Sequence, residues 1–304
     1  MSVDGPGLAV GVDLGGTATR FVSLNGDREV VFQFIEGTPS QGSKESVVRF
    51  LVDNIRRLTA EQPIGSIGIG ASGPIDAKGI IRNDETLPAF SNVDLIGKLE
   101  LELDHRPTID NDAVTAAIGE YRLGSGRGAK DVLMVTLGTG VGVCLLQDGK
   151  PFKATSGQHP EASHVSLVGV PAPCYCGRLR CWEQTASRTA LQESASALID
   201  HPTLTSRDID RALGLAEAGD ERSRQMFASY GHSLGEGLLT LISAYGPDRV
   251  IIGGSGSNYL DGYEPALRQS LEQITGIDAG MIFASELGEY GGAIGASLVA
   301  TSTT

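Results

Sequence analysis

The sequence predicts an α/β protein with two lobes around a central cleft, because of its length, its alternation of strand and helix patterns, and a repeated motif. Its 304 residues are about twice the usual length of one domain. The apolar share of 40% and the charged share of 20% are typical of a chain that folds around a core. We therefore expect two compact lobes without a long linker.

Strand and helix patterns alternate along the chain. Apolar residues with period 2 predict a strand at 8–14, helical spacing predicts a helix at 46–58, and an apolar run predicts a strand at 64–71. This order indicates a largely parallel sheet. In the second half, a helix is expected within 221–245 and a buried strand at 250–252.

A glycine-tipped hairpin occurs twice. The strand at 8–14 turns through Gly15-Gly16-Thr17, and a strand at 132–136 is followed by the turn Gly138-Thr139-Gly140. Glycine lets backbone N–H groups approach an anion, and threonine adds a hydroxyl donor, so such a tip can hold a phosphate. Neither copy is a Walker A loop or a Rossmann fingerprint. The alternative is a pair of ordinary turns.

Two aspartates stand out beside these patterns. Asp13 lies in an otherwise apolar strand, as an edge carboxylate or as an outer-shell ligand of the magnesium that accompanies nucleotide phosphates. Asp112 lies where a strand hands over to a helix, whose N–H groups favour an ionised carboxylate. It is either an N-cap or a general base that deprotonates an attacking hydroxyl, with Asn111 orienting the substrate.

Three of the four cysteines crowd into eight positions. The series His164, Cys174, Cys176 and Cys181 offers three thiolates and one imidazole, which is a closed, structural zinc shell. Unrelated buried cysteines or a disulfide are the alternative, but cysteines two apart bridge poorly. Glu161 and Glu183 flank the series. An ion that ties these segments together would fix both carboxylates, which suggests that they recognise a polyhydroxylated ligand.

Charge and hydropathy restrict the partners and the location. The 24 basic and 37 acidic residues give a net charge of −13, which opposes binding to nucleic acid or anionic lipid. The longest apolar stretch, 132–146, is interrupted by glycines and threonines and is shorter than the roughly 18 residues of a membrane span. The first residues lack the pattern of a signal peptide. We expect a cytoplasmic protein without membrane contact.

Five motifs, in this order and spacing, resemble those of the ROK family of bacterial sugar kinases and repressors. The resemblance covers essentially the whole chain. The motifs are Asp13-Leu14-Gly15-Gly16-Thr17, Asn111-Asp112, Leu137-Gly138-Thr139-Gly140, Glu161-Ala162-Ser163-His164 and Cys174-Tyr175-Cys176-Gly177 with Cys181-Trp182-Glu183.

The resemblance implies the actin-like ATPase (ribonuclease H-like) fold and transfer of the ATP γ-phosphoryl group to a hexose hydroxyl, typically the 6-OH. It implies Asp112 as the catalytic base and Mg²⁺ and structural Zn²⁺ as cofactors. The nucleotide-binding set would be Asp13, Gly15, Gly16, Thr17, Gly138, Thr139, Gly140, Gly253 and Gly254. The sugar-binding set would be Asn111, Asp112, Glu161, His164 and Glu183, with His164 also on zinc beside Cys174, Cys176 and Cys181.

The lobes that we expect are residues 1–112, completed by a C-terminal helix at 290–304, and residues 113–289 with the zinc motif. Glucose is the default sugar, polyphosphate in place of ATP stays open, and a homo-oligomer (dimer or tetramer) is implied. The sequence departs from the usual family pattern at several positions, which are Thr86, Val114, Val143, Cys144, Ser163 and Arg180.

The alternative function is a sugar-binding sensor or regulator of the same family without kinase activity. Repressors of the family carry a helix-turn-helix module ahead of the first hairpin. Asp13 lies thirteen residues into the chain, so we expect no such module.

Overall fold

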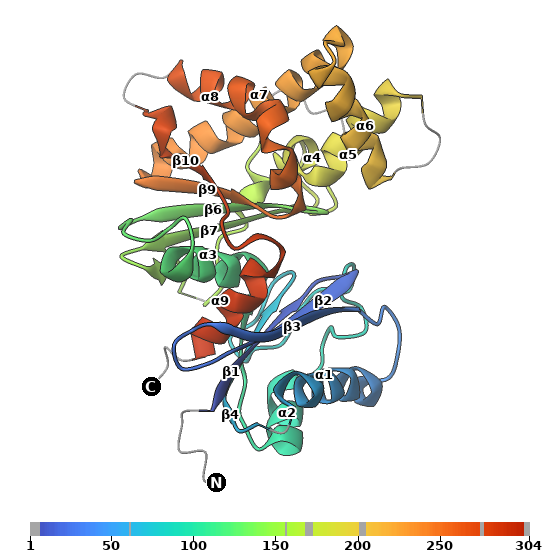
Figure 1. Ribbon diagram of the computed structural model, residues 1–304, viewed down its shortest axis with the longest axis vertical. Helices are drawn as coiled ribbons and strands as arrows, with labels where there is room; N and C mark the ends of the chain where they lie inside the picture. Colours follow the sequence, from blue (N-terminus) through green and yellow to red (C-terminus); the bar gives the residue numbers. More distant parts are fainter. Residues whose placement is uncertain are drawn as a thin grey trace. The chain divides into compact units, whose positions relative to one another are not determined.

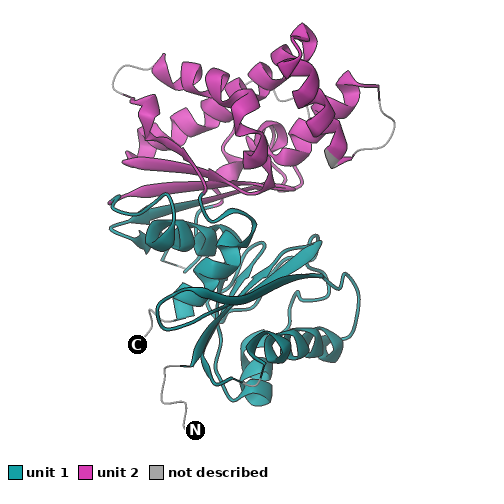
Figure 2. Ribbon diagram, in the orientation of Figure 1, with its two compact units in different colours: residues 1–129, 144–160, 286–304 teal, residues 130–143, 161–285 magenta. Residues whose placement is uncertain are grey.

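The computed structural model describes residues 7–60, 62–155, 157–167, 173–200, 205–273 and 277–300. The chain forms two compact units, which Figure 2 distinguishes by colour. Unit 1 comprises Met1–Ala129, Cys144–Pro160 and Glu286–Thr304, and unit 2 comprises Lys130–Val143 and Glu161–Ser285.

The strands and helices follow the predicted alternation (Figure 1). The strands are β1 (Leu8–Leu14), β2 (Ala18–Leu24), β3 (Val30–Gly37), β4 (Ile64–Ala71), β5 (Thr108–Asn111), β6 (Val132–Leu137), β7 (Val141–Gln147), β8 (Lys150–Pro151), β9 (Arg249–Gly253) and β10 (Ile282–Ala284). The α-helices are α1 (Lys44–Thr59), α2 (Leu95–Leu103), α3 (Asp112–Leu123), α4 (Glu183–Ala186), α5 (Arg188–Leu198), α6 (Ser206–Glu217), α7 (Glu221–Tyr245), α8 (Leu260–Glu272) and α9 (Gly291–Ala300). Short 3₁₀ helices are η1 (Ala162–His164), η2 (Ser255–Tyr259), η3 (Ala279–Met281) and η4 (Gly288–Tyr290).

The two sheets repeat one topology. Their strand orders are β3-β2-β1-β4-β5 and β10-β9-β6-β7-β8. Each therefore begins in sequence with an antiparallel meander and adds two parallel strands on the other side of its first strand. This shared order confirms the duplication that the paired glycine hairpins predicted.

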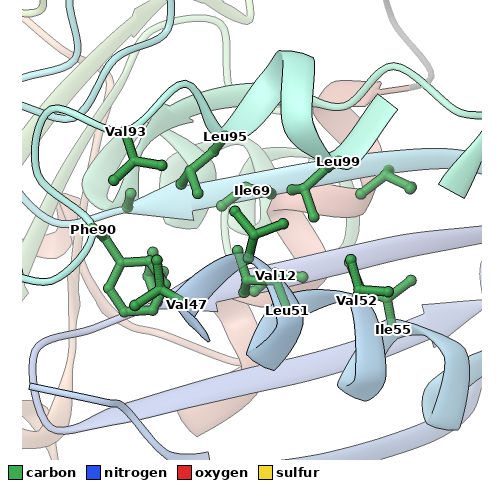
Figure 3. Close-up of a cluster of buried hydrophobic side chains, with 14 of the residues drawn as sticks. Val12, Val47, Leu51, Val52, Ile55, Ile69, Phe90, Val93, Leu95 and Leu99 are labelled. Carbon is green, nitrogen blue, oxygen red and sulfur yellow. The ribbon is translucent and has the colours of Figure 1, made fainter. Parts of the chain in front are cut away.

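In unit 1, α1 and α2 cover one face of the first sheet. Inward residues of α1, among them Leu51 and Ile55, pack against Val12 of β1 and Ile69 of β4, and Leu99 of α2 joins the same cluster (Figure 3). All five are essentially inaccessible to solvent. The apolar stripe of α1 has the helical spacing that predicted it, and the cluster holds β1 rigid beneath its glycine tip.

The opposite face of the first sheet carries α9, and α3 lies along α9 (Figure 1). The contact is at backbone distance, because a Cβ at Gly68 of β4 would overlap the carbonyl of Ala296, and one at Gly295 would overlap that of Thr115. Only glycine permits this approach. Thus α3 belongs by its contacts to unit 1, although the sequence placed residues 113 onward in the other lobe. The lobe boundary at 112/113 stays a prediction, and the part of the expected 290–304 helix beyond Ala300 lies outside the described residues.

Unit 2 stacks its helices on β6, β9 and β10. The long helix α7 begins at Glu221, where the N-cap Asp220 accepts a hydrogen bond from the N–H of Ser223. It ends at Tyr245, and the C-cap Gly246 has the left-handed conformation. It packs against α8 and against α4. Within the described part of the chain, no helix is both long and apolar enough to cross a membrane.

Candidate functional site

The carboxyl ends of β1, β4 and β5 lie at the same edge of the first sheet, since these strands are parallel. Asp13 stands near the end of β1, Ser72 follows β4, and Asp112 follows β5. Ligands bind at this edge in open α/β sheets. The fold therefore gathers the two aspartates that the sequence singled out into one acidic cluster.

Asp112 is the first residue of α3, and Asn111 is its N-cap. Of the two interpretations of Asp112, the N-cap is therefore wrong: the Asn111 side chain makes the capping bond. Asp112 Oδ1 also accepts from the Ala113 N–H at 2.9 Å. Burial raises the pKa of the Asp112 carboxyl above its usual range, while the Ala113 N–H, the Ser72 hydroxyl and His159 oppose the rise.

Asp13 faces this carboxyl. Burial and the charge of Asp112 raise the pKa of Asp13 to about 7, against the opposing effect of Arg20. Arg20 Nη1 lies 3.9 Å from Asp13 Oδ2, and its Nη2 donates to Glu289 Oε1 at 2.9 Å. Two neighbouring carboxylates that cannot both ionise cheaply fit a divalent cation, whose charge would relieve their repulsion.

Asn111 is buried, and its amide oxygen and amide nitrogen each make one hydrogen bond. The Oδ1 atom accepts from the Ala113 N–H at 2.9 Å, and the Nδ2 atom donates to the carbonyl of Gly73 at 3.1 Å. The loop after β4 is held in turn by Asn83, whose Nδ2 donates to the Ser72 carbonyl at 3.0 Å. Sequence reasoning missed Ser72 and Asn83, although the position of Ser72 directly after a parallel strand was an available signal.

The first glycine hairpin joins β1 to β2 beside the acidic cluster. Its backbone is tightly packed, since a Cβ at Gly16 would lie 2.7 Å from the carbonyl oxygen of Thr86. The Thr38 hydroxyl donates to the Gly15 carbonyl at 2.7 Å, and the Thr38 N–H donates to the Thr17 carbonyl at 3.0 Å. The hairpin is thus braced by neutral groups of unit 1.

The second hairpin joins β6 to β7 and is braced by a carboxylate. Glu183 Oε2 accepts from the Val141 N–H at 2.9 Å. A Cβ at Gly140 would overlap this same oxygen. The tip itself closes with a bond from the Gly138 N–H to the Gly140 carbonyl at 2.9 Å. Glu183, which the sequence assigned to sugar recognition, thus also touches the expected phosphate hairpin.

The glycine turn after β9 lies against the same hairpin. Gly254 has φ +75°, and a Cβ there would lie 2.6 Å from the carbonyl oxygen of Leu137. A side chain is therefore excluded both by conformation and by space. This contact brings together two of the segments that the sequence assigned to the nucleotide.

The predicted zinc ligands converge. His164, Cys174, Cys176 and Cys181 each offer a ligand atom, and these atoms all lie within 4.8 Å of one another. Cys176 Sγ is 3.5 Å from Cys181 Sγ, and Cys174 Sγ is 3.7 Å from His164 Nδ1. Tetrahedral zinc, with bonds of about 2.0–2.3 Å, needs ligand atoms about 3.5–3.8 Å apart. The donor set and spacing fit one zinc ion, which would close its shell with no position left for water.

Arg180, in the loop between the cysteines, has φ +65°. The left-handed region favours glycine, so an arginine here strains the backbone. The strain lies next to the predicted zinc ligand Cys181, and all four candidate ligand atoms still lie together.

Deep packing anchors the residues after the loop. Trp182 is fully buried and its Nε1 donates to the Ser233 carbonyl of α7 at 3.1 Å. The Tyr230 hydroxyl, also from α7, donates to the Ala186 carbonyl at 2.6 Å. Cys181 on one side and these contacts on the other fix the start of α4, where Glu183 is the first residue.

Among the described residues, each unit thus collects its own share of the predicted site. Unit 1 holds Asp13, Gly15, Gly16, Thr17, Asn111 and Asp112, and unit 2 holds Gly138, Thr139, Gly140, Glu161, His164, Cys174, Cys176, Cys181, Glu183, Gly253 and Gly254. Arg20, Ser72 and Tyr175 contact these residues but were not singled out by the sequence.

Comparison with known proteins identifies the family of this chain. A family model described as "ROK family" matches residues 9–303. The chain belongs to the ROK family. It is 31% identical over 283 residues to a glucokinase of Halalkalibacterium halodurans. The matched region covers 86% of this chain and 84% of that protein.

Other relatives include a solved structure and a repressor. A ROK family glucokinase of Streptomyces griseus, solved with glucose and AMPPNP, is 28% identical, with a TM-score of 0.82 over 97% of this chain and 99% of its own. A xylose repressor of Caldicellulosiruptor bescii is 26% identical over 282 residues, 88% of this chain and 70% of the repressor. The fold is the actin-like ATPase fold of the family, as the resemblance implied.

Proposed function

We propose that this protein transfers the γ-phosphoryl group of ATP to a hydroxyl of a hexose, with glucose as the default acceptor and the 6-OH as the position. The class of enzyme follows from the family and from relatives named glucokinase: the chain is a sugar kinase. The observation that carries the finer proposal is the acidic cluster, in which Asp112 begins a helix at the sheet edge beside the first glycine hairpin.

Asp112 is the proposed general base. It accepts the proton of the sugar hydroxyl as that oxygen attacks the γ-phosphorus, and ADP leaves on the opposite side. Its raised pKa brings the carboxylate closer in basicity to the working pH than an ordinary aspartate, which improves proton transfer. The Ser72 hydroxyl and the Ala113 N–H orient the carboxylate.

The two glycine hairpins are the proposed phosphate sites, and the turn at Gly253-Gly254 lies on the adenosine side. Magnesium, when bound, neutralises phosphate charge, and Asp13 would hold it through its water shell. Polyphosphate in place of ATP would use the same hairpins. Asn111, Glu161, His164 and Glu183 are the proposed sugar contacts, and structural zinc would keep the last three in place.

A coupled assay of ADP release, run over hexoses and N-acetylhexosamines with ATP and Mg²⁺, tests the proposal. We expect sugar-dependent ADP release with at least one hexose. The second candidate, a sugar-binding sensor or regulator, is favoured by the similarity to xylose repressors. Thermal stabilisation by a sugar without ADP release would support the sensor and reject the kinase.

A further inference from the structure

Glu120 is a buried carboxylate near the end of α3, the helix whose first residue is Asp112. It is 1% exposed. Its Oε1 accepts from the Leu287 N–H at 2.9 Å, and its Oε2 accepts from the N–H groups of Glu286 at 3.2 Å and Ser125 at 2.9 Å. Hydrogen bonds to an ionised group are stronger than neutral ones, so these bonds offset the cost of burying the charge and hold the bound backbone in place.

The backbone that Glu120 holds is the point at which the chain returns to unit 1. Unit 2 ends at Ser285, whose N–H donates to the Ile252 carbonyl of β9 at 2.9 Å, and unit 1 resumes at Glu286. The chain then continues through η4 into α9, which begins at Gly291. Glu120 therefore fixes the segment that leads directly into α9.

The first turn of α9 packs on the carboxyl group of Asp13. A Cβ at Gly292 would lie 3.0 Å from both Cγ and Oδ2 of Asp13, and its nearest neighbours outside α9 all belong to this aspartate. The same helix lies at backbone distance from α3, where a Cβ at Gly295 would overlap the carbonyl of Thr115. The pair of helices thus locates both aspartates of the acidic cluster, because Asp112 begins α3 and Asp13 lies against α9.

An ion pair connects η4 to the same carboxyl group. Glu289 Oε1 accepts from Arg20 Nη2 at 2.9 Å, and Arg20 Nη1 lies 3.9 Å from Asp13 Oδ2. Arg20 stands opposite Asp13 in the pairing of β1 with β2. The segment after Leu287 therefore reaches Asp13 twice, once through Glu289 and Arg20 and once through the backbone of Gly292. All of these residues belong to unit 1.

We propose that Glu120 is a positioning residue for phosphoryl transfer, which sets where Asp13 lies relative to Asp112 by holding the segment that leads into α9. The inference rests on the proposed function, because it takes both aspartates as parts of the phosphoryl-transfer site. Phosphoryl transfer depends on accurate placement of the groups around the reacting atoms, so a small shift of either carboxylate lowers the rate.

Glu120→Gln keeps the size of the side chain and replaces one acceptor oxygen by an amide group that cannot accept. At least one of the three backbone N–H groups then loses its partner. We expect kcat on the preferred hexose to fall about tenfold or more, while the sugar dissociation constant stays within about twofold of the wild type. Hydrogen exchange of the peptide that spans 286–287, read by mass spectrometry, should become several-fold faster.

Asp208→Asn is the matched control. Asp208 is also a buried carboxylate, 4% exposed, and it accepts from the Thr205 N–H at 2.9 Å, but it lies in α6 of unit 2. Its substitution should lower the Tm and leave kcat unchanged at temperatures well below the Tm. The control therefore separates a loss of stability, which both variants should show, from the loss of kcat that only Glu120→Gln should show.

Gly292→Ala tests the contact with Asp13 while Glu120 stays intact. Its methyl group would press on the Asp13 carboxyl, whereas the methyl group of Gly214→Ala in α6 would meet nothing within 4 Å. Alanine favours a helix over glycine, so both helices should persist. We expect kcat to fall several-fold in Gly292→Ala and to stay unchanged in Gly214→Ala. Combined with Glu120→Gln, the effect of Gly292→Ala should be clearly non-additive.

Wild-type kcat in Glu120→Gln despite faster exchange at 286–287, or wild-type kcat in Gly292→Ala, would overturn the inference. An equal loss of kcat in Asp208→Asn would also overturn it, since stability alone would then explain the effect. If Glu120→Gln does not fold, Gly292→Ala beside Gly214→Ala decides. Hexose-dependent ADP release by the wild type tests the proposed function separately: with an active wild type only the positioning role can fail, and without ADP release on any hexose both are rejected.

Discussion

The two glycine hairpins share a place in duplicated sheets but are braced by different chemistry. The first is held by the Thr38 hydroxyl and packs on the Thr86 carbonyl, and both are neutral groups. The second is held by the Glu183 carboxylate, which comes two residues after the predicted zinc ligand Cys181. We therefore expect a bound metal to affect the second hairpin and not the first.

The acidic residues divide in the same way. The strand before the first hairpin carries Asp13, while the matching position before the second is Thr136. The first hairpin has a carboxylate that is costly to ionise, and the second has a carboxylate already satisfied by a backbone N–H. The two hairpins therefore share a backbone turn and differ in the charged groups around it.

Loss of a metal ligand should give the largest contrast between the hairpins. Cys181→Ser should remove the metal, weaken sugar binding about a hundredfold or more, and speed amide exchange at Val141 while exchange at Thr38 stays slow, because only Val141 depends on Glu183. Metal analysis, calorimetry and hydrogen exchange measure these effects. Cys144→Ala, at a buried cysteine outside the cluster, should keep the metal. A full metal content in Cys181→Ser would contradict the assignment.

Removal of the Glu183 charge should have the next largest effect. Glu183→Gln keeps the shape and an acceptor oxygen but loses the charge, so sugar affinity should fall about tenfold or more, since bonds to an ionised group are roughly twice as strong as neutral ones. Glu193→Gln, at an exposed position of α5, is the control. Equal sugar dissociation constants for Glu183→Gln and the wild type would show that Glu183 only supports the hairpin.

Alanine substitutions at Gly140 and Gly16 should show that only the second hairpin depends on Glu183. Gly140→Ala places a Cβ on Glu183 and should weaken sugar binding several-fold. Combined with Glu183→Gln, its effect should be clearly non-additive. Gly16→Ala meets a backbone carbonyl instead, so it should reduce kcat/KM for ATP about tenfold and combine additively with Glu183→Gln. Equal coupling at both glycines would show that the two hairpins do not differ in their dependence on Glu183.

The smallest effect concerns Asp13 and stability. Its folded-state pKa of about 7 exceeds the value of about 3.9 in an unfolded chain, so its contribution to stability is lost as pH rises from about 4 through 7. In magnesium-free buffer, the Tm of Asp13→Asn should therefore rise relative to that of the wild type as the pH increases. The difference should reach a few degrees at pH 8. Asp53→Asn, at an exposed position of α1, should show no such trend. A Tm difference that does not change with pH would mean that Asp13 is not desolvated.

The elements with strong local patterns were predicted well. The strand at 64–71 and the helix at 221–245 agree with β4 and α7, because each has a clear period and clear breakers at its ends. The predicted metal ligands also come together, since their spacing alone constrains them. These features depend on neighbours in sequence.

What the sequence did not reveal depends on contacts between distant segments. Ser72 reaches Asp112 only because the parallel strands β4 and β5 end at one edge, and Tyr175 meets His164 only because the segment that carries the cysteines folds back. Arg20 lies opposite Asp13 in the antiparallel β1–β2 hairpin. The cap of α3 was uncertain because Asn111 and Asp112 are both good caps. The association of α3 with α9 follows from glycine contacts that no periodicity reports.

The most direct test of the account is the turnover of Asp112→Asn on the preferred hexose with ATP and Mg²⁺, measured beside its sugar dissociation constant. Loss of a general base predicts a kcat lower by about 10²–10⁴, while the sugar dissociation constant stays within about threefold of the wild type. Turnover above a tenth of the wild-type value, with metal content and sugar binding intact, would contradict Asp112 as the base.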